Sequence, residues 1–140
     1  MKSFSFLFFV LFTFSVEAES EYPYEPNVVC LNGKLVKEIK YGAPNYGETP
    51  DIDKKTTIYV LVLNSKITVG TNESLSEVNT DVFHDVKYLQ LIIDSKGSKE
   101  NLERLVGGFI SVKGKLFQKI SGHHYYSVLM STELENISKI

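Results

Sequence analysis

Short segments in which apolar and polar residues alternate dominate the chain. From Val29 to Tyr41 the odd positions are mostly apolar or glycine, and the even positions are mostly polar. A period of two is typical of a strand with one buried face, and Gly33 within it permits a bend. Thr56 to Leu63 is apolar on both faces, which predicts a central strand covered on both sides. Ile67 to Val69 is expected to extend it after a turn at Asn64-Ser65.

The second half of the chain mixes one helical pattern with further strands. Leu102, Leu105 and Val106 recur at helical spacing, so residues 98–106 are expected to form a helix of about two turns, with Ser98 as its N-cap. Gly107-Gly108 then supplies a stop. The remaining strands are predicted at Val86 to Ile93, Ile110 to Leu116 and Tyr126 to Ser131. Residues 42–53 and 71–81 are expected to be loops.

Three strands, a short helix and two further strands follow one another in the order of the OB-fold. We therefore expect an all-β protein with one short helix, a five-stranded OB-like Greek-key barrel whose helix lies between strands 3 and 4. Closure of the sheet would bury the second face of the apolar central strand and remove free edges. A β-sandwich is the alternative, but it needs more strands than the pattern provides.

The first 18 residues have the features of a cleavable secretory signal. Met1-Lys2 carries one positive charge, Phe4 to Val16 is apolar, and Val16-Glu17-Ala18 is suited to a signal peptidase. The apolar run is too short for a membrane span. We expect residues 1–18 to be a signal peptide, 19–27 a flexible N-terminal segment and 28–140 a single OB-like domain. The mature protein is then expected in the periplasm or outside the cell, with no membrane span after cleavage.

Charge and cysteine content exclude several classes of protein. The net charge is −2 and lysines are interspersed with glutamates, so no basic face for nucleic acid is expected. Cys30 is the only cysteine, which excludes an internal disulfide. We expect Cys30 to pack in the first strand as a small residue; the alternatives are an intermolecular bridge or a reactive thiol. The protein is expected to be a monomer.

His123 and His124 are the sharpest chemical feature of the sequence. Imidazoles can bind a transition metal or change charge near neutral pH. Successive side chains of a strand point to opposite faces, so both rings would reach one ion only from a turn, and further ligands would be needed. We expect the pair to order the turn by hydrogen bonding, with a metal-binding protein centred on His123 and His124 as the alternative.

The two loops that flank the usual binding face of an OB-fold carry a set of semi-polar residues. These loops are residues 42–53 and 118–125, and their closeness in the fold would bring five residues into one patch. Tyrosine and histidine offer a large contact area at modest entropic cost. The predicted patch consists of Asn45, Tyr46, His123, His124 and Tyr125. The alternative is that the two loops simply pack on each other.

No motif in the chain indicates catalysis or a cofactor. A Gly-x-Ser-x-Gly elbow, a phosphate-binding glycine loop, a His-Glu-x-x-His helix and a zinc-type cysteine pair are all missing from the sequence. We therefore expect a non-enzymatic binding module that uses the two loops and no cofactor. Its expected partner is a protein or an envelope component such as a glycan.

Three segments of the chain carry a resemblance to a known family. YGAPNYGETP, LVGGFISVKGKLF and SGHHYYSVLM resemble a family of small secreted bacterial proteins labelled only as a domain of unknown function. The resemblance implies an OB-like module behind a signal peptide, and it implies no particular activity. The family usually has Gly-His-His-His-Thr where this chain has Gly122 to Tyr126, and often a second cysteine where it has Thr68. A three-histidine metal site and a disulfide to Cys30 would both be incomplete here.

Overall fold

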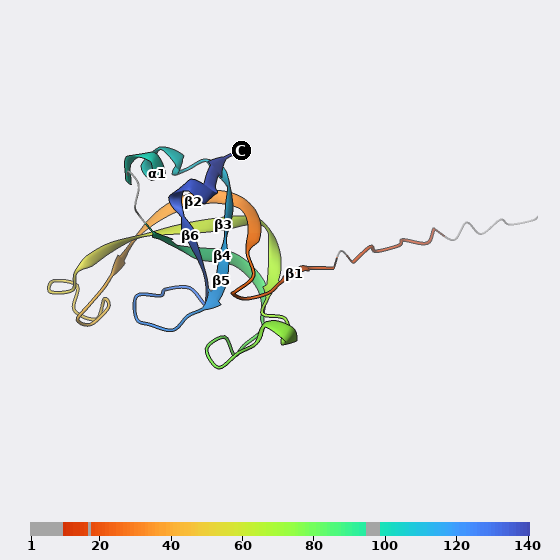
Figure 1. The fold of residues 1–140 in the computed structure, drawn as a ribbon, viewed down its shortest axis with the longest axis horizontal. Helices are drawn as coiled ribbons and strands as arrows, with labels where there is room; N and C mark the ends of the chain where they lie inside the picture. Colours follow the sequence, from red (N-terminus) through yellow and green to blue (C-terminus); the bar gives the residue numbers. More distant parts are fainter. Residues whose placement is uncertain (1–9, 17, 95–98) are drawn as a thin grey trace, which may run out of the picture.

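The computed structural model describes residues 10–16, 18–94 and 99–140, and it shows a β-barrel with one α-helix. The long strands are β2, β3, β4, β5 and β6, with the helix α1 between β4 and β5 (Figure 1). Their bounds are Val29–Tyr41, Lys55–Val69, Phe83–Asp94, Phe109–Gln118 and Val128–Glu133, and α1 spans Lys99–Leu105. Short elements add to these: β1 at Ser20–Tyr22, β7 at Ile137–Lys139, and 3-10 turns η1 at Asn72–Ser74 and η2 at Leu134–Asn136.

The five long strands close into a barrel with the order expected of an OB-fold. The path runs β3-β2-β5-β6-β4, and an additional β3–β4 pairing closes it. The β4–β6 pair is parallel, whereas the other neighbours within the barrel are antiparallel. β1 adds to β3 and β7 adds to β5 outside this closed path. The predicted fold class, including the helix between the third and fourth barrel strands, is therefore confirmed.

Alternation along the strands places the core inside the barrel. Leu35, Leu61, Leu89, Ile110 and Leu116 are fully buried in one cluster. α1 contributes Leu102 to that cluster, so the helix covers one end of the barrel. Burying side chains of this size supplies on the order of 2 kcal/mol each before entropic costs, which makes this cluster the main source of stability.

Glycines in the first and fourth barrel strands allow close contacts with the neighbouring strands. A Cβ at Gly33 would collide with the carbonyl of Val62 on β3, and one at Gly114 would collide with the carbonyl of Ser131 on β6. Only glycine permits such an approach of two backbones. The close approach of β2 to β3 and of β5 to β6 therefore depends on these two glycines.

The middle of the second barrel strand differs from the prediction. β3 runs without a break through Asn64 and Ser65, where a turn was expected. The β3–β4 pairing changes register between Val62 and Ile67. The exposed polar residues that suggested a turn therefore lie in an irregular, bulge-like part of the strand. The helix α1 begins at Lys99, as expected if Ser98 is its N-cap, and it ends at Leu105, one residue before the expected Val106. Ser98 itself lies outside the described residues.

The segment expected to be a flexible lead-in is instead packed on the barrel. β1 pairs in parallel with the end of β3, and the Tyr24 side chain is fully buried. The Tyr24 hydroxyl donates a hydrogen bond to the carbonyl of Asp81 at 2.7 Å. The acidic and proline-rich composition suggested flexibility, but the Tyr24 side chain belongs to the core cluster and ties the segment to the barrel.

Two residues of β2 are exposed although the sequence pattern assigned them to packed positions. Ile39 is 67% exposed, because β2 continues beyond the barrel body and has no core beneath it at that point. Cys30 is exposed because β2 buries its odd residues there, and its thiol lies 3.3 Å from the Ser111 hydroxyl. Cys30 is therefore not a core residue.

Candidate functional site: a surface built from two loops

The loop between β5 and β6, residues 119–127, folds across the outer face of β3 and β4. Gln90 of β4 fixes its backbone: the Gln90 amide donates to the carbonyl of His123 at 3.0 Å and accepts the N–H of Tyr125 at 2.7 Å. Gln90 is itself 2% exposed. A buried amide that satisfies two loop backbone groups holds that loop firmly, since losing either bond would leave polar groups unpaired.

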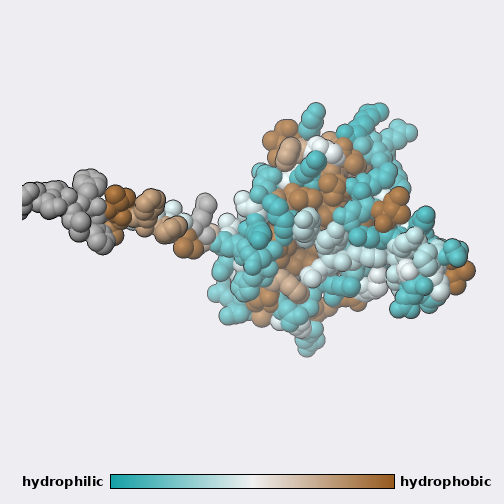
Figure 2. Space-filling model, turned by 180° about the vertical axis from the view of Figure 1, so that it is seen from behind, coloured by the Kyte–Doolittle hydropathy of each residue, from teal (hydrophilic) through white to brown (hydrophobic). Residues whose placement is uncertain are grey.

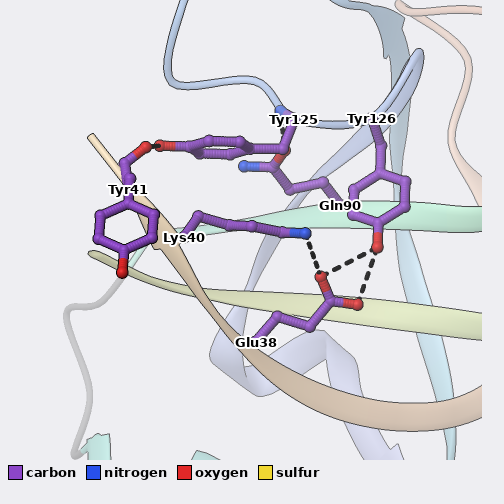
Figure 3. Close-up of polar contacts among 6 residues, drawn as sticks. All are labelled: Glu38, Lys40, Tyr41, Gln90, Tyr125 and Tyr126. Atoms are coloured by element: carbon purple, nitrogen blue, oxygen red, sulfur yellow. Dashed lines mark hydrogen bonds and ion pairs between the residues drawn. The ribbon is translucent and has the colours of Figure 1, made fainter. Parts of the chain in front are cut away.

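Tyr126 anchors the same loop to β2. Its hydroxyl donates to the Glu38 carboxylate, which also pairs with Lys40 at 2.9 Å (Figure 3). Burial raises the pKa of Glu38, but Lys40 and Tyr126 outweigh that effect and hold it below its usual value. Burial and the Glu38 carboxylate raise the pKa of Tyr126 to about 12, so its hydroxyl stays protonated and donates at neutral pH.

The 119–127 loop explains why β3 is apolar on both faces. Ile58, Val60 and Leu129 are buried, yet they lie outside the cluster in the barrel interior. They are packed on the outer side of the sheet, the side on which the 119–127 loop is anchored. In an OB-fold this face of the sheet commonly receives ligands. Here the protein's own loop occupies it.

The loop between β2 and β3 is organised around one carboxylate. Asp53 is 7% exposed and accepts the backbone N–H groups of Asn45 and Gly47, each at 2.8 Å, and of Thr49 at 3.1 Å. Burial raises the pKa of Asp53, but these donors outweigh it, so that its pKa lies below the usual value. The ionised side chain therefore gives a loop rich in glycine and proline a defined shape.

The two loops meet at their tips. A Cβ at Gly122 would lie 2.9 Å from the Tyr46 hydroxyl, so the tyrosine lies directly against this glycine. The rings of Tyr46 and His123 are 6.3 Å apart in an edge-to-face arrangement. The Tyr125 hydroxyl donates to the carbonyl of Tyr41 at 2.8 Å (Figure 3). We call the surface formed by Tyr46, His123 and Tyr125 the two-loop surface.

Only three of the five residues predicted to form a patch contribute to the two-loop surface. Tyr46 is 45% exposed, His123 is exposed, and Tyr125 is partly buried where its loop reaches Tyr41. The side-chain amide of Asn45 donates to the Thr49 hydroxyl within its own loop. The remaining residue of the predicted patch is His124, whose ring also turns back into its own loop.

His124 stabilises the tip of the 119–127 loop. Its Nδ1 accepts the N–H of Ile120 at 3.2 Å, and its ring lies 5.5 Å from that of Phe117. Burial lowers the pKa of His124, and the neighbouring His123 and Lys119 lower it further. The neutral imidazole is therefore the form that fits this turn, in agreement with the ordering role expected for His124. The exposed His123 side chain lies against Tyr46 instead.

The metal-binding alternative finds few ligands around this pair. Among the described residues, no group of three or more histidine, cysteine, aspartate or glutamate side chains is placed to hold one ion. Nδ1 of His124 is already used as an acceptor. The third histidine, His84, lies at the start of β4, where its Nδ1 is 3.2 Å from the Thr68 hydroxyl.

Several residues that shape the surface were not singled out from the sequence. Gln90 could have been identified from the sequence, because it is a polar residue inside the apolar run VKYLQLII and a buried amide requires hydrogen-bond partners. Glu38, Lys40 and Tyr126 carry no such signal, since charged and tyrosine residues are ordinary on exposed strand positions. Their importance follows from contacts with remote parts of the chain.

Comparison with known proteins finds one partial match. Residues 88–137 match the family model described as Domain of unknown function (DUF4431). The matched part runs from the middle of β4 to the start of β7, and it includes His123, His124 and Tyr125. The segment YGAPNYGETP, which also contributed to the resemblance, lies outside it. Searches of curated proteins and of solved structures found no match.

Proposed function

We propose that this protein is an exported, non-catalytic binding module whose contact region is the two-loop surface. The observation that carries the proposal is the junction of Tyr46 with Gly122 and His123, which joins two loops into one exposed aromatic patch. Tyrosine and histidine combine apolar area with hydrogen-bonding groups and lose little entropy when they are fixed. The proposed partner is an envelope protein or an envelope glycan.

The sheet face itself is a poor candidate for the contact region. Gln90, Val60 and Leu129 lie under the 119–127 loop and are almost completely buried. A ligand that used the sheet in the manner of many OB-folds would first have to remove that loop. The exposed tips of the loops need no such rearrangement, which favours recognition through the two-loop surface.

The N-terminal segment supports export of the protein. Residues 10–16 and Ala18 are exposed, and the apolar side chains of Leu11, Phe14 and Val16 are 81%, 88% and 90% exposed. Figure 2 shows apolar side chains on a segment that extends away from the barrel. A folded protein rarely leaves such a run in water. The Glu19 carboxylate, just after this segment, contacts the barrel by accepting the Thr68 hydroxyl.

No helix among the described residues is long and apolar enough to cross a membrane. Glu19 is also the residue that would become the new N-terminus after cleavage at Ala18. Export is tested by intact-mass measurement of the protein recovered outside the cytoplasm, which should begin at Glu19. Recovery of the uncleaved chain from the cytoplasm alone would contradict the export proposal.

Partner binding is tested with immobilised protein and two separate probes, solubilised envelope proteins and purified envelope polysaccharide. Material that is retained by the wild type should be lost with Tyr46→Ala and with His123→Ala. Both side chains are exposed and neither is part of the core, so the fold should be unchanged. Phe109→Ala is the matched control, since Phe109 is a 55% exposed aromatic residue at the far end of β5.

The same experiment separates the two partner classes. Retention from only one of the two probes identifies the class of partner. Equal retention by the wild type and both loop variants would show that the two-loop surface is not the contact region.

A further inference from the structure

The outer part of β2 has an unpaired edge. β2 pairs with β5 from Val29 to Lys34, and with β3 from Gly33 to Tyr41. Within the described residues, the part of β2 after Leu35 therefore has a strand neighbour on one side only. Proteins normally cover or guard such an edge, because its free backbone groups can pair with another chain.

The orientation of the free backbone groups follows from the neighbouring hydrogen bonds. Leu35 exchanges backbone hydrogen bonds with Gly107 and Gly108 on the β5 side. The N–H and C=O of successive residues in a strand point to alternate sides. Lys37 and Ile39 therefore direct their backbone groups away from β3, toward the unpaired side. The next such carbonyl, that of Tyr41, accepts the Tyr125 hydroxyl.

Side chains of opposite charge flank one apolar residue along this edge. The run is Lys37-Glu38-Ile39-Lys40-Tyr41, with an apolar residue at its centre. Ile39 is 67% exposed. Glu38 and Lys40 lie on the same face of the strand, because they are two positions apart and pair with each other at 2.9 Å. An antiparallel copy of the run centred on Ile39 would place opposite charges against each other.

We propose that a second copy of this chain pairs with the outer edge of β2 in an antiparallel arrangement with two-fold symmetry. Ile39 of each chain lies opposite Ile39 of the other, as a hydrogen-bonded pair that uses the outward backbone groups of both. Glu38 of each chain then lies opposite Lys40 of the other, on the more closely spaced non-hydrogen-bonded positions. Each carboxylate is placed between its own Lys40 and that of the second copy.

The charge pattern selects a second copy over an unrelated strand. A symmetric pair of chains uses the same patch twice, so every residue must be compatible with its counterpart. In this register the glutamate–lysine pairing occurs on both sides of the axis, and no like charges among these residues face each other directly. The contact is small, so a weak, concentration-dependent dimer is expected. The contact adjoins the two-loop surface at Tyr41, whose carbonyl accepts the Tyr125 hydroxyl.

Charge-swap complementation tests the proposal. Glu38→Lys creates a chain with lysine at both positions, and Lys40→Glu creates one with glutamate at both. Each variant alone places like charges opposite each other, and its self-association should weaken by about tenfold or more in sedimentation velocity runs. An equimolar mixture restores both pairs, and a heterodimer should form. Circular dichroism checks that each variant is folded.

A backbone variant tests the same edge independently. Ile39→Pro removes an N–H that points away from β3, so the barrel should remain intact while the dimer is lost. Lys113→Glu is the matched control for charge, because it makes the same change as Lys40→Glu at an exposed position of β5. That control should dimerise like the wild type.

The outcomes that overturn the proposal are equally specific. A wild type that stays monomeric at the highest concentration, a dimer that survives Ile39→Pro, or a charge-variant mixture that remains monomeric would each exclude this interface.

Discussion

Gln90 and Tyr125 are joined by a partly buried hydrogen bond that spans 35 positions of the chain, in which the Tyr125 N–H donates to the Gln90 side-chain oxygen at 2.7 Å. Through this contact, the third barrel strand fixes the loop that covers its own outer face. The buried amide of Gln90 therefore fixes the part of the candidate binding surface that carries His123 and Tyr125.

Gln90→Ala should loosen the 119–127 loop without unfolding the barrel. The change leaves the His123 carbonyl and the Tyr125 N–H unpaired, which costs on the order of 1–3 kcal/mol of unfolding free energy. Denaturant titration measures the loss, and hydrogen exchange should show faster exchange at residues 123–126. Ile92→Ala, at an exposed position of the same strand, is the control and should change neither the unfolding free energy nor the exchange of the loop amides. Unchanged exchange in the loop of the Gln90 variant would contradict this role.

Mild acid should loosen the same loop through His124. Burial lowers the pKa of His124 below its usual 6.5, so the unfolded or released loop binds a proton more readily than the ordered one. The stabilisation is therefore complete above the unfolded pKa and is lost as the pH falls from about 6.5 toward the lower folded value. Hydrogen exchange of the Ile120 amide as a function of pH measures the effect.

His124→Asn provides the control for the acid effect, because it keeps a neutral acceptor near the Nδ1 position and does not titrate. The pH dependence of the Ile120 amide should disappear in this variant once the intrinsic exchange rate is subtracted. If the wild type and His124→Asn showed the same pH dependence, a group other than His124 would be responsible for it.

Asp53→Asn should disorder the loop between β2 and β3. The amide brings two donors to a position that accepts three backbone N–H groups, so at least one of those bonds is lost. Limited proteolysis within residues 42–54 should become faster, and binding through Tyr46 should weaken. Asp51→Asn is the matched control, since Asp51 is an exposed carboxylate of the same loop. Equal proteolysis of the two variants would exclude the organising role of Asp53.

Strong acid should reproduce the effect of the Asp53 substitution. Hydrogen bonds from the backbone lower the pKa of Asp53 below 3.8 despite its burial. Its stabilising contribution is therefore present above the unfolded pKa and is lost as the pH falls through the lower folded value. Proteolysis with an acid-active protease should reveal the loosened loop in the wild type only at such pH values.

Tyr24→Ala should destabilise the whole barrel, although Tyr24 lies in a segment whose composition suggested flexibility. Removing a fully buried aromatic side chain costs on the order of 3–5 kcal/mol of unfolding free energy. Thermal or denaturant unfolding measures this loss. Tyr46→Ala, at an exposed tyrosine, should change the stability far less. Similar stability of the two variants would contradict the packing of Tyr24.

Local patterns were sufficient for the barrel itself. Alternation in β2 and β5, the two-sided apolar run in β3 and the short helical spacing in α1 depend on neighbours two to four positions apart, and those neighbours lie side by side in the folded elements as well. Gly33 was recognisable for the same reason, because a missing side chain within an alternating strand permits a bend. The close backbone approach at Gly33 and at Gly114 is seen only in the structure. The element order then limits the fold to few topologies.

Long-range contacts determined what lies on the surface of that barrel. Tyr126 and Glu38 are 88 positions apart, and neither carries a local sign that the two will pair. The burial of Tyr24, the exposure of Ile39 and the inward turn of His124 likewise depend on which segment happens to pack nearby. Burial is a property of the assembled chain rather than of a residue, so the pattern of residues specified the strands, and the packing of remote segments specified the site.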